Sequence, residues 1–248
     1  MASGKLNVSA LVGAYLPFVI LTPFYCLYMA TVHKQEKPFP GATITSTACH
    51  YPQDIAFRYF MLIVSSILAL IFFMLFRWTV SVAKQAGFEK PIASYLYKLS
   101  LFSILLYGIT IGTIDEKGTG PLHGPCAVIF FLILILAIIE LTLYLTELRA
   151  FNTSVLDLTS LRAKQLLAGY LIAVWIYCII MIIIVSIGET GWESKTDKFV
   201  NIVEWNTVTI GLLWVLSFCW EWKQMNLCLI QPNGELFVPS LCKMSFMN

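Results

Sequence analysis

Charged residues are scarce in this chain, and that scarcity excludes most soluble architectures. Of 248 residues only 12% are Asp, Glu, Lys or Arg, where a soluble domain carries about 25%. Hydrophobic residues make up 58%, and the mean hydropathy is +0.79. Because so few charges cannot cover a globule with water-compatible side chains, we expect the fold to lie within a bilayer.

The sequence also lacks the short motifs of common catalytic sites. It contains no His-Glu-x-x-His zinc motif and no Gly-x-Ser-x-Gly nucleophile elbow. We expect no cofactor and no nucleic-acid partner, and the residues alone leave open whether a metal is bound.

The seven cysteines do not form a disulfide framework. Cys49 and Cys126 fall on the side assigned below as outer, where either a bridge between them or two thiols would fit the spacing. Three others lie inside apolar runs, where cysteine packs as a small apolar residue: Cys26, Cys178 and Cys219.

Six long apolar runs dominate what the sequence does contain. Crossing about 30 Å of hydrocarbon takes roughly 20 apolar residues as a helix. The runs are continuous in Leu, Ile, Phe and Val and lack the alternation of a porin strand, which favours helices over a barrel. They are Leu6–Val32, Tyr59–Trp78, Tyr95–Thr113, Gly124–Leu148, Gln165–Ile187 and Ile202–Trp222. We predict an all-α polytopic membrane protein with six transmembrane helices in a single domain, residues 1–248.

The distribution of Lys and Arg predicts the orientation. The first run is too long for a signal peptide and lacks a small-residue cleavage site, so we interpret it as a span. With the N-terminus inside, ten of the sixteen Lys and Arg residues are internal and eight of the fourteen acidic residues external. Both termini are therefore expected in the cytosol. The sequons at Asn7 and Asn152 would share that side and carry no glycan.

Two loops and one span carry further local signals. Residues 33–58 are rich in hydroxyl and β-branched side chains, which predicts an ordered, extended outer loop across the mouth of the bundle. Residues 77–98 are basic and predict, in part, an amphipathic helix on the inner surface. Pro17 and Pro23 are expected to kink the first span.

Polar residues with chemical potential collect on the outer side. His123 stands where the fourth run enters the membrane and Glu204 where the sixth does. Such a ring would bind a lipid headgroup, hold a divalent metal or act as an acid and base pair. Alternatively, the same residues simply cap helices and contact water at the bundle mouth. The other members of the ring are His33, Thr45, Ser46, Thr47, His50 and Asp54.

Glu140 is the one carboxylate deep within a run. It follows His123 by 17 residues, which places it about 25 Å deeper along a helix. A carboxylate at that depth costs about 2.5–3.5 kcal/mol unless it faces the bundle interior, which we therefore expect. Lys98 is a reachable partner. Glu140 would then form a structural ion pair or, when protonated, a hydrogen bond between helices. Alternatively, it would take part in the passage of lipid or ions. Because an ion channel normally has several such residues on different spans, a single one disfavours a channel.

Three stretches carry a resemblance to a known family. They are Pro40–Arg58, Leu122–Gly124 with the following Phe130-Phe131, and Val203–Trp205. With the six-span layout they resemble the Frag, DRAM and Sfk family of membrane proteins. DRAM-like members read Ile-Ser-Asp-Thr-Gly where this chain has Ile44-Thr45-Ser46-Thr47-Ala48, so the resemblance is closer to the post-GPI-attachment factor branch.

The resemblance implies a function at the luminal or outer leaflet. It implies a protein that acts on or senses lipids in GPI-anchor lipid remodelling, or in trafficking of GPI-anchored proteins, in Golgi or ER endomembranes or the plasma membrane. Expected partners are membrane lipids, GPI-anchored proteins or other membrane subunits. The alternatives are a non-enzymatic lipid-binding scaffold and a structural subunit of a larger assembly, so whether the protein is an enzyme stays open.

The residues and the resemblance together give a set of expected site residues. His123 and Glu204 are the expected catalytic pair. The residues expected to contact lipid are Ser46, His50, Asp54, Arg58, Glu140 and Trp205.

Overall fold

The computed structural model describes residues 5–34, 41–115, 118–187, 192–222, 226–228 and 240–241. Within them the regular secondary structure is helical apart from strands of two or three residues. The helices are α1 Val8–Val32, α2 Ile44–Thr47, α3 Gln53–Gln85, α4 Ala93–Gly112, α5 His123–Phe151, α6 Leu158–Ile187, α7 Trp192–Leu216 and α8 Cys219–Trp222. The strands are β1 Lys5–Asn7, β2 Ile114–Asp115, β3 Gly118–Thr119, β4 Asn226–Cys228 and β5 Ser240–Leu241.

Five helical segments of the described chain are long and apolar enough to cross a bilayer. They are Gln53–Gln85, Tyr95–Gly112, His123–Phe151, Leu158–Ile184 and Phe199–Trp222. The helix α1 contributes a shorter apolar stretch, Leu21–Val32. The helical membrane architecture is thereby confirmed, whereas the count of six spans stays a prediction.

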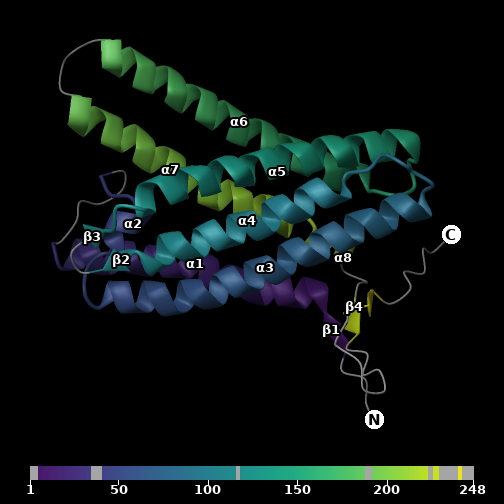
Figure 1. Ribbon diagram of the computed structural model, residues 1–248, viewed down its shortest axis with the longest axis horizontal. Coiled ribbons are helices and arrows are strands. Elements are labelled where there is room, and N and C mark those ends of the chain that lie inside the picture. The colour runs from purple at the N-terminus through teal and green to yellow at the C-terminus, as the bar shows by residue number, and fades with distance from the viewer. Residues whose placement is uncertain are drawn as a thin grey trace.

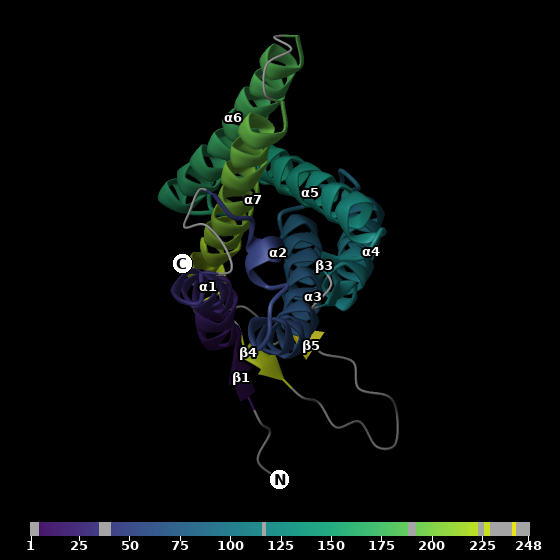
Figure 2. The same cartoon turned by 90° about the vertical axis from the view of Figure 1, so that its left-hand side faces the viewer.

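The helices pack in two groups (Figure 1). In the first, α1 packs on α3, α3 on α4 and α4 on α5. In the second, α6 and α7 form a pair that contacts α5 and leans away from it toward one end (Figures 1 and 2). We call that end the outer end; it carries α2, β2, β3 and the first turn of α5. The opposite inner end carries α8, β1 and β4.

The first and last described segments meet at the inner end. The strand β4 pairs antiparallel with both β1 and β5, so that Lys5 lies opposite Cys228 and Leu227 opposite Leu241. The Asn7 side chain then caps α1 by accepting a hydrogen bond from the Ala10 amide at 3.0 Å. Both described chain ends therefore lie on one side of the bundle.

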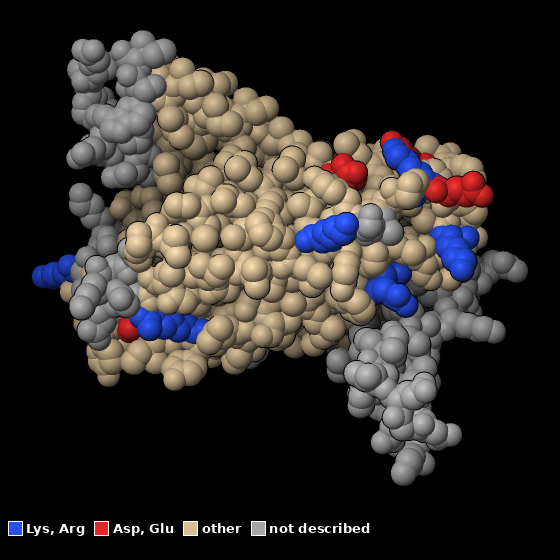
Figure 3. Space-filling model, viewed as in Figure 1, with Lys and Arg blue, Asp and Glu red and all other residues tan. Residues whose placement is uncertain are grey.

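The surface and the core have the character of a membrane bundle. Exposed large apolar side chains include Leu166 and Tyr59, with 75% and 69% of their surface exposed. On the face in Figure 3, charged side chains lie mainly toward the inner end, with a few at the outer end. The buried Phe218 ring contacts Trp78, Trp214 and Trp222, with centroids 4.9–5.7 Å apart. Each such aromatic pair adds about 0.5–1.5 kcal/mol beyond its burial.

A buried ion pair joins α6 to α8 beside these aromatic rings. The Lys164 ammonium donates to both Glu221 carboxylate oxygens at 3.0 and 3.1 Å, to Ser160 Oγ at 2.6 Å and to the Ser217 carbonyl at 3.2 Å. It also lies 4.2 Å from the Phe218 ring centroid. The Lys164 side chain is fully buried and that of Glu221 is 8% exposed. We call Ser160, Lys164 and Glu221 the inner polar cluster.

The described part of the outer loop after residue 40 contains a helical turn where an extended segment was expected. Thr43 and Ser46 form a reciprocal capping box, which starts the one-turn helix α2. Ile44 and Thr47 are buried, and α2 packs against α1 and α7. The prediction of extended structure was wrong because local hydroxyl capping and burial of Ile44 outweigh β propensity.

The basic inner segment also differs from its prediction. No separate surface helix occurs over 77–98, all of which the structure describes, because α3 continues to Gln85. Gly87 then turns the chain at φ 73°, and Phe88 packs on Tyr144 with ring centroids 5.4 Å apart. This aromatic contact holds the loop between α3 and α4 against α5, so that the loop does not form a helix on the membrane surface.

The helix α1 is continuous through Pro17 and Pro23.

Candidate functional site

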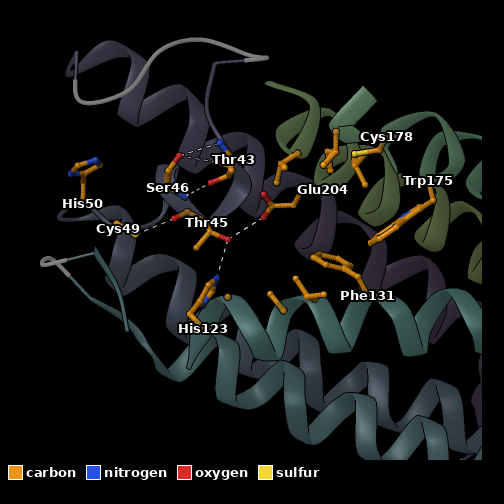
Figure 4. Close-up of a pocket in the computed structure, with 16 residues that line it drawn as sticks. Thr43, Thr45, Ser46, Cys49, His50, His123, Phe131, Trp175, Cys178 and Glu204 are labelled. Atoms are coloured by element: carbon orange, nitrogen blue, oxygen red, sulfur yellow. Dashed lines mark hydrogen bonds between the residues drawn. The ribbon is translucent and has the colours of Figure 1, made fainter. Parts of the chain in front are cut away.

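The short helix α2 is seated at the outer end by side chains from α1 and α7. Trp205 Nε1 donates to the Ala42 carbonyl at 3.1 Å, and the Trp205 ring lies 5.4 Å from that of Phe24. With Ile44 and Thr47 buried on one side of α2, the Thr45 side chain points toward α5 and α7 (Figure 4).

Three side chains from three elements meet there, and we call them the outer polar cluster: Thr45, His123 and Glu204. The Thr45 hydroxyl lies 3.0 Å from Glu204 Oε1 and 3.3 Å from His123 Nε2 (Figure 4). The other ring nitrogen, His123 Nδ1, lies 2.7 Å from the Thr110 carbonyl oxygen. His123 is 8% exposed. The Thr45 hydroxyl group therefore links α2 to α5 and α7.

The pairing of β2 with β3 brings the end of α4 against His123. The Gly120 amide donates to the Thr113 carbonyl at 2.8 Å, and the His123 amide donates to the Gly120 carbonyl at 3.0 Å. A Cβ at Gly120 would lie 3.3 Å from the Thr113 carbonyl oxygen, so glycine permits this close approach. The result is that Thr110, near the end of α4, reaches the imidazole ring at the start of α5.

The outer polar cluster forms part of the wall of a cavity of about 740 Å³. The cavity lies between α2, α5 and the diverging α6–α7 pair, with hydroxyl and imidazole groups at one end and apolar side chains over the rest (Figure 4). Two lining residues, Val128 and Val200, are 54% and 47% exposed, so the cavity opens on the apolar surface. Its other apolar lining includes Ala127, Phe131, Trp175, Cys178, Ile182 and Val203.

A second, smaller cavity of about 60 Å³ lies on the other side of the same residues. Thr45, His123 and Glu204 line both cavities together with Ala127 and Phe131, and we call these five residues the partition between the cavities. The smaller cavity is otherwise mostly apolar, with Tyr107 and Thr110 as its remaining polar lining residues.

Of the residues expected to contact lipid, Ser46 and His50 line the larger cavity. The Ser46 hydroxyl is engaged in capping: it donates to the Thr43 carbonyl at 3.2 Å and accepts from the Thr43 amide at 3.1 Å. The bridging hydroxyl is thus that of Thr45, which the sequence placed in the outer ring without singling it out. Three successive hydroxyl residues gave no signal of which one the turn of α2 would direct inward.

Asp54, Arg58 and Trp205 line neither cavity. Asp54 is buried in the first turn of α3, and Arg58 follows one turn later. Among the described residues, neither Asp54 Oδ1 nor Arg58 Nε has a hydrogen-bond partner. Trp205 acts on the site indirectly, by holding the segment that precedes α2.

Glu140 lies away from the site, and its expected orientation was wrong. The side chain is exposed on α5 and does not face the bundle interior, and no ion pair joins it to Lys98, although the structure describes both residues. The exposed ion pair near this position joins Glu147 to Lys90. Because α5 is apolar on all sides, its sequence does not show which face is buried.

The described part of the chain contains neither a cluster of metal ligands nor the disulfide bond that the sequence left open. No group of three His, Cys, Asp or Glu side chains there would hold a metal ion. His33, the remaining histidine, is exposed at the end of α1. Cys49 and Cys126 are not disulfide-bonded, and Cys49 Sγ lies 3.3 Å from the Thr45 carbonyl oxygen.

Comparison with known families gives a match over most of the chain. Residues 7–225 match the model of the Frag1/DRAM/Sfk1/Cwh43P N-terminal domain. The chain belongs to this family. With its apolar helices, it is a multi-pass integral membrane protein of the Frag1/DRAM/Sfk1 family. No curated protein and no solved structure matches the chain significantly.

Proposed function

We propose that this protein binds membrane lipids in the larger cavity and acts on them through the outer polar cluster. The observation that carries the proposal is one cavity with apolar walls and, at one end, a buried imidazole and a half-buried carboxyl group. Its volume of about 740 Å³ falls in the range of roughly 300–1,000 Å³ that small-molecule sites occupy. An amphiphile with an acyl chain and a polar headgroup matches both parts of this lining.

The depth of the cavity favours the outer leaflet. Its lining along α5 extends from His123 to Phe131, eight residues or about 12 Å along the helix axis. That is less than half of the roughly 30 Å thickness of the hydrocarbon. The exposed lining residues Val128 and Val200 provide a lateral mouth through which a lipid would enter from the bilayer.

The proposal includes a topology with six spans and both termini in the cytosol. The pairing of β1 with β4 at the inner end supports placing both termini on one side. The excess of Lys and Arg supports the cytosol as that side. The outer polar cluster then faces the lumen of the Golgi or ER, or the exterior at the plasma membrane.

The process we propose is lipid remodelling of GPI anchors, or trafficking of GPI-anchored proteins. Its support is the sequence resemblance to the post-GPI-attachment branch, together with a lipid-sized cavity at the leaflet where such anchors lie. His123 would serve as acid or base and Glu204 as its partner, an arrangement suited to acyl transfer or hydrolysis. Its partners would be lipids and GPI-anchored proteins.

A scaffold that holds lipid without turning it over is the second candidate. The observation favouring it is a group of exposed basic residues near the inner end, Lys84, Lys90 and Lys98, of which Lys90 is paired with Glu147. Such a group would attract partner subunits or anionic lipid. Charge reversal at these positions would then abolish function, whereas substitution of His123 and Glu204 would not.

The test is mass spectrometry of the lipid on a GPI-anchored reporter. Cells lacking the protein would be rescued with wild type, with His123→Ala plus Glu204→Ala, or with Glu140→Ala, which removes an exposed carboxylate from α5. We expect wild type and Glu140→Ala to restore the anchor lipid and the double variant, at equal abundance, to restore less than a tenth. An anchor lipid that is the same in all cells would refute GPI remodelling.

A further inference from the structure

The contacts of His123 fix the position of one proton. His123 Nδ1 faces the Thr110 carbonyl oxygen at 2.7 Å, and a carbonyl oxygen only accepts hydrogen bonds. The other neighbour of Nδ1 is Thr113 Oγ1 at 3.4 Å, whose own proton is donated to the same carbonyl at 3.1 Å. Both neighbours therefore act as acceptors toward the ring, so Nδ1 carries a proton.

With Nδ1 protonated, the Thr45 hydroxyl has two alternative arrangements. In one, the Glu204 carboxyl group donates to Thr45 Oγ1, and the hydroxyl donates to a neutral His123 at Nε2. In the other, a protonated Nε2 donates to Thr45 Oγ1, and the hydroxyl donates to the Glu204 carboxylate. The distances of 3.0 and 3.3 Å accommodate both.

The two arrangements differ by the transfer of one proton. As the Glu204 O–H bond breaks, a new O–H bond forms at Thr45; as the original Thr45 O–H bond breaks, an N–H bond forms at His123 Nε2. One proton moves from Glu204 to His123, no electrons are exchanged, and the hydroxyl group ends as it began.

We propose that Thr45 is a positioning residue through which His123 and Glu204 share one proton and so respond as a unit to a lipid in the cavity. This inference deepens the proposed function and rests on it for the ligand, although its test requires no lipid turnover. It gives the partition between the two cavities a chemical role, since a proton accepted at one residue can be released at the other.

Other titratable groups around the partition are few among the described residues. Cys49 and His50 of the loop around α2 and Cys178 of α6 line the larger cavity, and Tyr107 of α4 lines the smaller one. The nearby lining from α1 and α3 is Pro23, Phe57 and Met61, none of which titrates. Any test must therefore separate His123 from His50.

The experiment is nitrogen-15 NMR of the protein with labelled histidine rings, in nanodiscs of phosphatidylcholine. The chain has three histidines, so the signals are assigned by replacing His33 and His50 in turn with Gln. We expect the His123 ring to keep its Nδ1 proton throughout a pH titration, with protonation changing only at Nε2. A neutral His123 ring protonated at Nε2 instead would overturn the proposal.

A double-mutant comparison then tests the role of Thr45 itself. Glu204→Gln should alter the midpoint of the His123 titration in the wild-type and Thr45→Ser backgrounds, and alter it by less than half as much in Thr45→Val. An equal change in all three backgrounds would overturn the relay while leaving lipid binding intact. If Thr45→Val does not fold, Thr45→Ala, which also lacks the hydroxyl group, takes its place in the same comparison. Loss of GPI remodelling alone, with these spectra as expected, would count only against the proposed substrate.

Discussion

The bundle has a polar cluster at each end, and the two are built differently. In the inner polar cluster, Lys164 contacts Glu221, Ser160 and the Ser217 carbonyl, so its ammonium group is surrounded by acceptors. In the outer polar cluster, a single hydroxyl serves two titratable groups. The inner cluster lines neither of the outer-end cavities, whereas all three outer residues line both.

This difference indicates that the polar side chains of one cluster have a structural role and those of the other a chemical role. A buried charge that is fully hydrogen-bonded holds its helices in one arrangement and has no capacity left for a ligand. A cluster with one shared hydrogen and a face on a cavity retains that capacity. We therefore infer that the inner end stabilises the bundle and that the outer end carries the chemistry.

The largest expected effect comes from breaking the inner polar cluster. Lys164→Met should destabilise the protein by about 3–5 kcal/mol, because Glu221 would be left buried without its partner. Glu204→Gln at the outer end should cost about 1–2 kcal/mol, since a hydrogen-bonding group remains. Denaturant-induced unfolding in detergent, followed by circular dichroism, measures both.

The double variant Lys164→Met plus Glu221→Leu provides the control for that comparison. Because both charges are removed together, it should recover most of the lost stability. If Lys164→Met unfolds no more readily than Glu204→Gln, the assignment of the inner cluster to stability is wrong.

A smaller effect, confined to function, should follow from filling the larger cavity. Gly124 lines it, and a Cβ there would meet no atom within 4 Å. Gly124→Leu should reduce lipid retained on purification about tenfold, by placing a side chain in the space a lipid would occupy. Gly169→Leu is the matched control, because Gly169 is also open around its Cβ position but lies on α6 outside the cavity lining.

Lipid retention is measured by mass spectrometry of extracts from the purified variants. Both substitutions should leave the unfolding midpoint close to that of wild type. Equal retention by Gly124→Leu and Gly169→Leu would argue that lipid does not occupy this cavity.

The sequence predicted the helices well because their cause is local. Each of the six apolar runs is helical over most of its length, since a run of this length in lipid must satisfy its backbone hydrogen bonds internally. It also marked His123 and Glu204, because each stands where a run begins. The one-turn helix α2 was missed, since its Thr43–Ser46 capping box lacks the usual Glu or Gln.

The contacts that define the two clusters were beyond sequence reasoning. Thr45 and Glu204 are 159 positions apart, and Lys164 and Glu221 are 57 apart, so only the packing of whole helices brings them together. The exposure of Glu140 was also not predictable from the sequence. A helix that is apolar all round gives no periodicity from which to read its buried face.

The smallest effect expected is a pH dependence that originates beside the inner polar cluster. Asp157 Oδ1 accepts a hydrogen bond from the Ser160 amide at 3.0 Å, capping α6 at the residue that also contacts Lys164. That hydrogen bond holds the pKa of the exposed Asp157 carboxyl below its usual value of 3.8. Because the folded-state pKa is the lower one, the resulting stability is present above pH 3.8 and is lost as the pH falls through the folded-state pKa.

Asp157→Asn keeps the capping oxygen but does not titrate, so the difference in melting temperature between wild type and this variant should shrink from about pH 5 to about pH 3. A difference that stays constant over that range would mean that the charge of Asp157 does not stabilise the inner end.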